Sequence, residues 1–165
     1  MTNAENAIDP AEFRRVLGHF PTGVTVITAH DDDGPVGLTI GSFASVSLDP
    51  ALVAFFVGKE SGSWARIQNA GSFCVNVLGD DQGELGGLMA SRAEDKFAGV
   101  EWKPAGTGSP MLPDVIAVID CTLDAVHEGG DHWIVVGRVQ SLDTVRSDAA
   151  PLLFFKGGYG TFASL

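Results

Sequence analysis

A hydroxyl-rich segment, residues 39–47, follows an expected strand and has the composition of a phosphate-binding segment. It combines four hydroxyl side chains with a glycine that lets a ligand approach the backbone closely: Thr39, Ser42, Ser45 and Ser47, with Gly41. The alternative is a Ser/Thr-rich strand whose hydroxyls bond neighbouring backbone groups, and composition alone favours this alternative. Phosphate binding by residues 39–47 is therefore a hypothesis that needs support from the rest of the chain.

A second segment, residues 59–64, adds two hydroxyls immediately before an expected helix. Ser61 and Ser63 lie on either side of a glycine, and the free backbone N–H groups of a helix start attract anions. Taken in isolation, the spacing favours Ser63 as a helix N-cap that needs no ligand. The segment can contribute to an anion site or simply begin a helix.

A third segment, residues 91–97, places Arg92 and Lys96 close to Phe97 in an otherwise acidic chain. Guanidinium and ammonium groups are the side chains that bind phosphate and pyrophosphate. The alternative is a solvated run of charges with no ligand. Residues 91–97 are the third candidate contact for an anion.

Two residue pairs near a glycine turn, His127-Glu128 and Asp131-His132, superficially resemble metal ligands. The two histidines are five residues apart across the turn, which does not match the helical HExxH spacing, so we expect no metal. No GxGxxG motif follows a strand, and no GxxxxGK[ST] motif is present. A Rossmann-type dehydrogenase is therefore not expected.

The acidic balance of the chain limits what it can bind. The formal net charge is −11, with 10 Lys and Arg residues in total. A nucleic-acid surface is not expected, because neutralising phosphates needs clustered basic side chains. A small anionic ligand must be held largely by hydroxyls, backbone N–H groups and a few placed cations.

A short amphipathic helix is predicted to open the fold. Asp9 is placed as its N-cap, Pro10 as its first residue and Glu12 as the second member of a capping box. Apolar residues then recur on one helix face, and the helix is expected to end near Pro21. These apolar residues are Phe13, Val16, Leu17 and Phe20.

The remaining elements are mostly strands. Four β-like runs are bounded by Gly, Asp, Asn or Pro, at residues 23–29, 36–40, 52–57 and 73–78. Two longer β-rich runs, 114–126 and 132–142, are joined by a glycine-rich turn at 128–131. Short helices are expected at 63–69 and 84–91. A doubly wound sheet is disfavoured, and a closed barrel is the simplest way to protect the strand edges.

Length and composition predict one globular domain. Of 165 residues, 45% are hydrophobic and 19% charged; we assign residues 10–165 to this domain and residues 1–9 to a flexible N-terminal segment. The chain start lacks the pattern of a signal peptide, and no apolar stretch reaches roughly 18 residues, so we expect a cytoplasmic protein without membrane contact. Cys74 and Cys121 lie in apolar runs and are expected to be reduced core thiols.

Taken in order, a series of short motifs resembles the flavin reductase component of two-component flavin-dependent monooxygenases, over nearly the whole chain. Each motif is weak alone, but their ordered series is specific. The motifs are Phe13-Arg14, residues 20–28 from Phe20-Pro21-Thr22-Gly23 onward, Gly37-Leu38-Thr39, residues 42–50, Ser61-Gly62-Ser63-Trp64, residues 71–78, Asp95-Lys96-Phe97, residues 130–139, residues 151–155 and Gly158-Tyr159-Gly160.

The resemblance implies a mostly β protein with a few short helices, a split β-barrel of the FMN-binding type with Greek-key-like connections, and a homodimer. It also implies a set of flavin contacts: Thr39, Ser42, Ser45, Val46, Ser47, Ser61, Ser63, Arg92, Lys96, Phe97, Tyr159 and Gly160. Ser61, Ser63 and Arg92 would lie near the phosphate end of the flavin. His132 would lie at the nicotinamide.

The activity implied by the resemblance is reduction of FMN or FAD by a nicotinamide cofactor, with the reduced flavin passed to a separate monooxygenase component. Hydride transfer between stacked cofactor rings needs no protein base, which suits a sequence without an acid–base dyad. NADH is expected over NADPH, because recognition of a 2′-phosphate needs a local cation. Two alternatives are a flavin-binding electron carrier without nicotinamide turnover, and a ligand-free barrel that serves as an interaction module.

Overall fold

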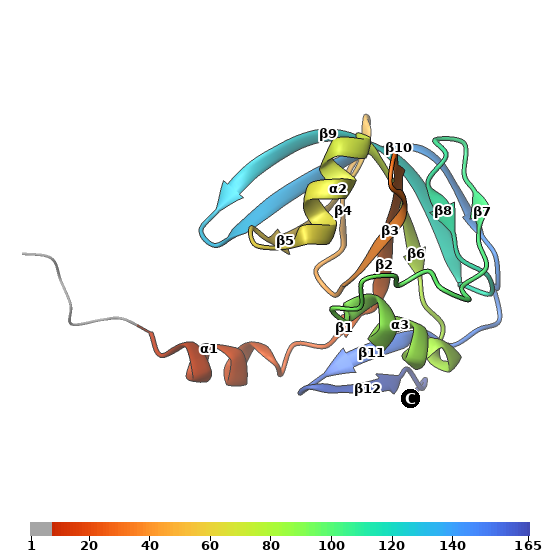
Figure 1. Ribbon diagram of the computed structural model, residues 1–165. Helices are drawn as coiled ribbons and strands as arrows, with labels where there is room; N and C mark the ends of the chain where they lie inside the picture. The colour runs from red at the N-terminus through yellow and green to blue at the C-terminus, as the bar shows by residue number, and fades with distance from the viewer. Residues whose placement is uncertain (1–7) are drawn as a thin grey trace, which may run out of the picture.

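The computed structural model describes residues 8–165, so most of the predicted N-terminal segment 1–9 lies outside the described residues. Within that range the protein has three α-helices and one short 3₁₀ helix, and its strands outnumber them (Figure 1). The helices are α1 (Pro10–Leu17), α2 (Gly62–Ala70), α3 (Gly83–Ala90) and η1 (Asp80–Gln82). No helix of residues 8–165 is long and apolar enough to span a membrane.

Seven strands form one antiparallel sheet in the order β3-β2-β6-β9-β10-β5-β4. Their bounds are β2 (Thr25–Asp31), β3 (Gly34–Ile40), β4 (Ala44–Leu48), β5 (Ala51–Gly58), β6 (Ser72–Val77), β9 (Ala117–Gly129) and β10 (His132–Thr144). The pairing of β2 with β6 and of β5 with β10 requires crossovers, because these strands are not neighbours in the sequence. Figure 1 shows the long strands β9 and β10 arching over the molecule, so that the sheet curls into a barrel.

Two smaller sheets complete the fold. The strands β1 (Thr22–Gly23), β11 (Leu152–Phe155) and β12 (Gly158–Thr161) form one sheet, and β7 (Lys103–Pro104) pairs with β8 (Pro110–Met111) in the other. The sheet of β1, β11 and β12 lies beside α3 at the lower end of the barrel in Figure 1. The predicted architecture, mostly β with a few short helices, is confirmed.

The core consists of two apolar clusters separated by the sheet. Strand side chains alternate between the two faces, so that on β2 Val26 belongs to one cluster and Ile27 to the other. Helix α2 covers the cluster that contains Phe55 and Phe73 by burying Trp64 against it. Helix α3 covers the other cluster through Met89 on its inner face. The two helices are thereby fixed on the barrel, which determines where their ends lie.

Several local predictions are confirmed, and three need correction: the first is that α1 ends at Leu17, before the expected end near Pro21. Asp9 caps α1 by accepting a hydrogen bond from the Ala11 N–H at 3.1 Å. The predicted capping box does not form, because Glu12 pairs with Arg15 at 2.6 Å instead. The N-cap of α2 is Ser61, which accepts from the Trp64 N–H, and not Ser63.

The predicted hairpin of the two long strands is confirmed, with a turn in which Gly130 has a φ of 70°. Cys74 and Cys121 are free thiols with no exposed surface, as predicted. Burial raises the pKa of both thiols to about 12. They are therefore protonated core residues at neutral pH.

Candidate functional site

The three segments that the sequence offered as anion contacts meet at one cavity of about 690 Å³. The cavity lies between strand β3, the first turn of α2, the end of α3 and the loop that follows α3. Each segment contributes polar side chains to its wall: Thr39 from the first, Ser61 and Ser63 from the second, and Arg92 and Lys96 from the third. We call this the anion cavity.

The two serines of the anion cavity have hydroxyl protons that no protein group accepts within the described residues. The Ser61 hydroxyl accepts a hydrogen bond from the Trp64 N–H at 3.2 Å, and the Ser63 hydroxyl accepts one from Lys96 Nζ at 3.4 Å. A hydroxyl carries one proton to donate in addition to its acceptor lone pairs. Both serines can therefore donate to an anion, at the start of a nine-residue helix whose dipole also favours negative charge.

Thr39 differs from the two serines. Its hydroxyl donates to the Gly86 carbonyl oxygen at 2.6 Å. Because its proton is engaged, Thr39 can offer a ligand only an acceptor. It suits a ligand N–H or O–H group better than a phosphate oxygen.

The cations of the anion cavity lack carboxylate partners. Within residues 8–165, neither Arg92 nor Lys96 lies within 4.0 Å of a carboxylate. Other cations do form such pairs: Arg15, Lys59, Arg66, Arg138 and Arg146. In a chain of net charge −11, two uncompensated cations beside two free hydroxyl protons give this cavity the charge and the donors that favour an anionic group.

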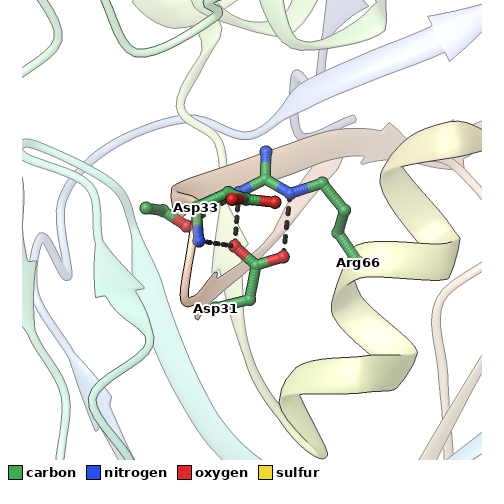
Figure 2. Close-up of polar contacts among 4 residues, drawn as sticks. Asp31, Asp33 and Arg66 are labelled. Atoms are coloured by element: carbon green, nitrogen blue, oxygen red, sulfur yellow. Dashed lines mark hydrogen bonds and ion pairs between the residues drawn. The ribbon is translucent and has the colours of Figure 1, made fainter.

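An ion pair fixes the first turns of α2 relative to the sheet. Arg66 of α2 donates from Nε to Asp31 Oδ2 at 2.9 Å and from its second nitrogen to Asp31 Oδ1 and the Gly34 carbonyl, at the β2–β3 turn (Figure 2). Asp31 also accepts from the Asp33 N–H at 3.1 Å. Hydrogen bonding to the Arg66 guanidinium holds the pKa of Asp31 below its ordinary value. Local sequence does not identify Arg66, because only the fold brings α2 to the hairpin.

A smaller cavity of about 320 Å³ adjoins the anion cavity and shares Ser63 and Lys96 with it. Its wall includes Phe97, whose ring is buried in the cluster under α3. The Asp95 carboxylate accepts from the Phe97 N–H at 2.9 Å and so shapes this loop. Lys96 thus stands between two cavities.

A second groove, of about 810 Å³, lies between α1 and the β9–β10 hairpin. It contains Ser42 and His132, together with Phe13 and Arg14 of α1. The His132 Nδ1 lies 2.7 Å from the Asp131 carboxylate, and this contact lowers the pKa of Asp131. His132 begins β10, and half of its side chain is exposed. The structure therefore places His132 and Ser42 together, apart from the anion cavity.

The Ser42 hydroxyl forms two hydrogen bonds with one backbone unit. It donates to the Phe56 carbonyl at 3.1 Å and accepts from the Phe56 N–H at 2.9 Å. This is the backbone-satisfying geometry that composition alone favoured for residues 39–47. These two hydrogen bonds hold the β3–β4 connection against β5.

We expect Ser42→Ala to lower the free energy of unfolding by about 1 kcal/mol, because it leaves both Phe56 backbone groups without their partner. Urea denaturation with a control variant, Ser45→Ala on the exposed edge strand β4, measures this loss. An unchanged unfolding midpoint for Ser42→Ala would show that solvent replaces the hydroxyl at no cost.

The remaining predicted site residues lie outside both openings. Ser45, Val46 and Ser47 are on the edge strand β4. Tyr159 and Gly160 are on β12, where the Tyr159 ring packs edge-on against Phe154. A Cβ built on Gly86 would lie 3.2 Å from the Tyr159 hydroxyl, so this ring reaches α3. The structure does not bring these residues into the anion cavity.

The fold is that of a small β-barrel protein with a cavity lined by hydroxyl, guanidinium and ammonium groups. The chain matches the Flavin reductase like domain family over residues 17–163, and it belongs to that family. The family and the split-barrel architecture expected from the motif series are thus confirmed.

Individual relatives are similar over nearly the whole chain. The reductase subunit HsaB of a flavin-dependent monooxygenase from Rhodococcus jostii is 52% identical over 156 residues, which are 94% of this chain and 80% of the relative. The crystal structure of nitrilotriacetate monooxygenase component B from Mycobacterium thermoresistibile superposes with a TM-score of 0.90 at 47% identity, covering 93% of this chain and 86% of that one. The NADH:FAD oxidoreductase SgcE6 of Streptomyces globisporus, in complex with NAD and FAD fragments, has a TM-score of 0.88 at 35% identity, covering 96% and 97%.

Proposed function

We propose that this protein is an NADH-dependent flavin reductase that reduces FMN or FAD and supplies the reduced flavin to a separate monooxygenase component. The observation that carries the proposal is the anion cavity, where Ser61, Ser63 and Arg92 offer free donors in an acidic chain. The names of the similar proteins support the activity: a monooxygenase reductase subunit and an NADH:FAD oxidoreductase.

The anion cavity fits the phosphate end of a flavin nucleotide. Two hydroxyl donors, a guanidinium and a helix start are the groups that bind a phosphate dianion. Thr39, which can only accept, would accept a hydrogen bond from a ribityl hydroxyl next to the phosphate. Ser42, Ser45, Val46, Ser47, Phe97, Tyr159 and Gly160 are further proposed contacts, carried by the family resemblance alone.

His132 is proposed to contact the nicotinamide. Bound flavin and nicotinamide would supply the hydride chemistry themselves, so the protein's part is to hold the two rings in register and keep water out. The Asp131 carboxylate 2.7 Å from His132 Nδ1 can accept a hydrogen bond from a protonated Nδ1, and in that tautomer of the neutral ring Nε2 is a hydrogen-bond acceptor. This acceptor suits the N–H of a carboxamide.

We also propose that the protein acts as a homodimer. Helix α1 buries none of its residues and extends away from the barrel in Figure 1. Its apolar side chains Phe13, Val16 and Leu17, and Phe20 just beyond it, are each at least half exposed. A surface of this kind favours association with another copy of the chain. Sedimentation of the flavin-binding protein at micromolar concentration would test the assembly.

A spectroscopic titration tests the proposed activity against its two alternatives. Flavin absorbance is followed with FMN or FAD added to the purified protein, and then with NADH or NADPH. A reductase bleaches the flavin over many turnovers, more efficiently with NADH. An electron carrier would hold flavin without catalytic nicotinamide oxidation, and a ligand-free barrel would leave both spectra unchanged; either result contradicts the proposal.

A further inference from the structure

Lys96 has all three of its ammonium protons placed on protein acceptors. Its Nζ donates to the Met89 carbonyl at 2.8 Å, to the Gly37 carbonyl at 3.2 Å and to the Ser63 hydroxyl at 3.4 Å. An ammonium group has three protons and no further hydrogen-bonding capacity. Lys96 therefore ties the end of α3, strand β3 and the start of α2 together, and has no proton left for a ligand.

Of these three acceptors, only the Ser63 hydroxyl can also donate a hydrogen bond. Carbonyl oxygens only accept, whereas a hydroxyl that accepts one hydrogen bond can donate another. Within residues 8–165 the Ser63 hydroxyl has no acceptor for its own proton, and the side chain lines the anion cavity. Because one lone pair of the Ser63 hydroxyl is directed at Lys96, its O–H bond points in another direction. The anion cavity provides space there for an acceptor.

We propose that Lys96 is a positioning residue that orients the Ser63 hydroxyl to donate to the phosphate of a bound flavin nucleotide, without contacting the phosphate itself. This inference rests on the proposed function. It assigns the two cations of the cavity different tasks: Arg92, which is exposed and has no protein partner within residues 8–165, contacts the anion directly, and Lys96 acts through Ser63.

The electrostatic surroundings of Lys96 are consistent with this division. Its side chain is half-buried, and burial lowers the pKa of its ammonium group. The charged residues around the two adjoining cavities are Glu60, Arg66, Arg92, Glu94 and Asp95, and none of these carboxylates lies within 4.0 Å of Lys96. The charge of Lys96 thus remains uncompensated and strengthens the Ser63 hydroxyl as a donor.

A double-mutant cycle with two ligands tests the inference. Lys96→Met, Ser63→Ala and the double variant are titrated with FMN and with riboflavin, which lacks the phosphate, by quenching of flavin fluorescence. We expect each single variant to bind FMN about tenfold more weakly, as for a lost hydrogen bond to a charged group. We expect the double variant to bind no more weakly than Lys96→Met, because both changes remove the same contact. Riboflavin affinity should stay unchanged in all three.

Control variants separate positioning from folding and from general charge. Lys103→Met removes one exposed positive charge on β7 and should leave FMN affinity unchanged. Ser63→Thr keeps the hydroxyl and, unlike Ser63→Ala, should bind FMN as tightly as the wild type. If Lys96→Met does not fold, Lys96→Arg takes its place in the cycle, because a planar guanidinium cannot point donors at the same three acceptors.

Two outcomes would contradict the inference about Lys96, and a third would contradict the proposed function. A double variant that loses the product of the two single losses would overturn the inference, because Lys96 would then act on the ligand independently of Ser63. Wild-type FMN affinity in Ser63→Ala would also overturn it. A wild-type protein that binds none of FMN, FAD and riboflavin would overturn the proposed function, and this outcome is distinct from the other two.

Discussion

Replacing Arg92 with methionine is expected to weaken FMN binding by about 10- to 100-fold, since a hydrogen bond to a charged group contributes about 1.5–3 kcal/mol. Arg92 lines the anion cavity with no carboxylate partner among the described residues, so removing it breaks no internal ion pair. Isothermal titration with FMN and with riboflavin measures the effect, and riboflavin affinity should change little.

A matched control tests whether Arg92 acts locally. Arg138→Met makes the same change of net charge on β10, where Arg138 pairs with Asp124 at 2.8 Å, and should leave FMN affinity at the wild-type value. Equal losses in both variants would mean that the net charge of the protein, and not a contact in the cavity, governs flavin binding. Equal losses for FMN and riboflavin in Arg92→Met would place Arg92 away from the phosphate.

Replacing His132 with alanine is expected to reduce kcat/KM for NADH by about tenfold or more, or about 1.4 kcal/mol, with little change in flavin affinity. The reason is spatial: His132 lines the groove under α1, and it does not line the anion cavity. Loss of a positioning hydrogen bond misaligns the nicotinamide, and hydride transfer is sensitive to that alignment. Steady-state kinetics at saturating flavin, with a separate flavin titration, measures both quantities.

The other histidine of the same hairpin provides the control. His127 is exposed on β9 opposite Ile134 and is absent from the lining of the groove, so His127→Ala should keep wild-type kinetics with NADH. Unchanged NADH kinetics in a folded His132→Ala variant would return His132 to the role of a surface residue in a turn. A large loss of flavin affinity would place it at the flavin instead.

Much of the fold could be predicted from local sequence. The β9–β10 hairpin follows from two long β-rich runs around a glycine turn, and the start of α1 from Asp9 and Pro10, because such signals act between neighbouring residues. Strand β4 is left open by the local sequence, because a Ser/Thr-rich strand is one of two interpretations of residues 39–47. Its residues 44–48 alternate apolar and hydroxyl side chains, but it is an edge strand whose side chains are mostly exposed, so the local pattern alone could not show which face would be buried.

The sequence by itself also determined the residue types of the anion cavity and, through an ordered series of motifs, the family. The tertiary structure decided which of those residues act together. Residue types specify which groups can donate, but the direction of each hydroxyl depends on partners from distant segments, such as Lys96 for Ser63 and Phe56 for Ser42. The Ser61 and Ser63 hydroxyls can still donate a hydrogen bond to a ligand, whereas the Thr39 and Ser42 hydroxyls donate to backbone carbonyls. Long-range pairing of strands and helices creates these contacts, and no local pattern encodes them.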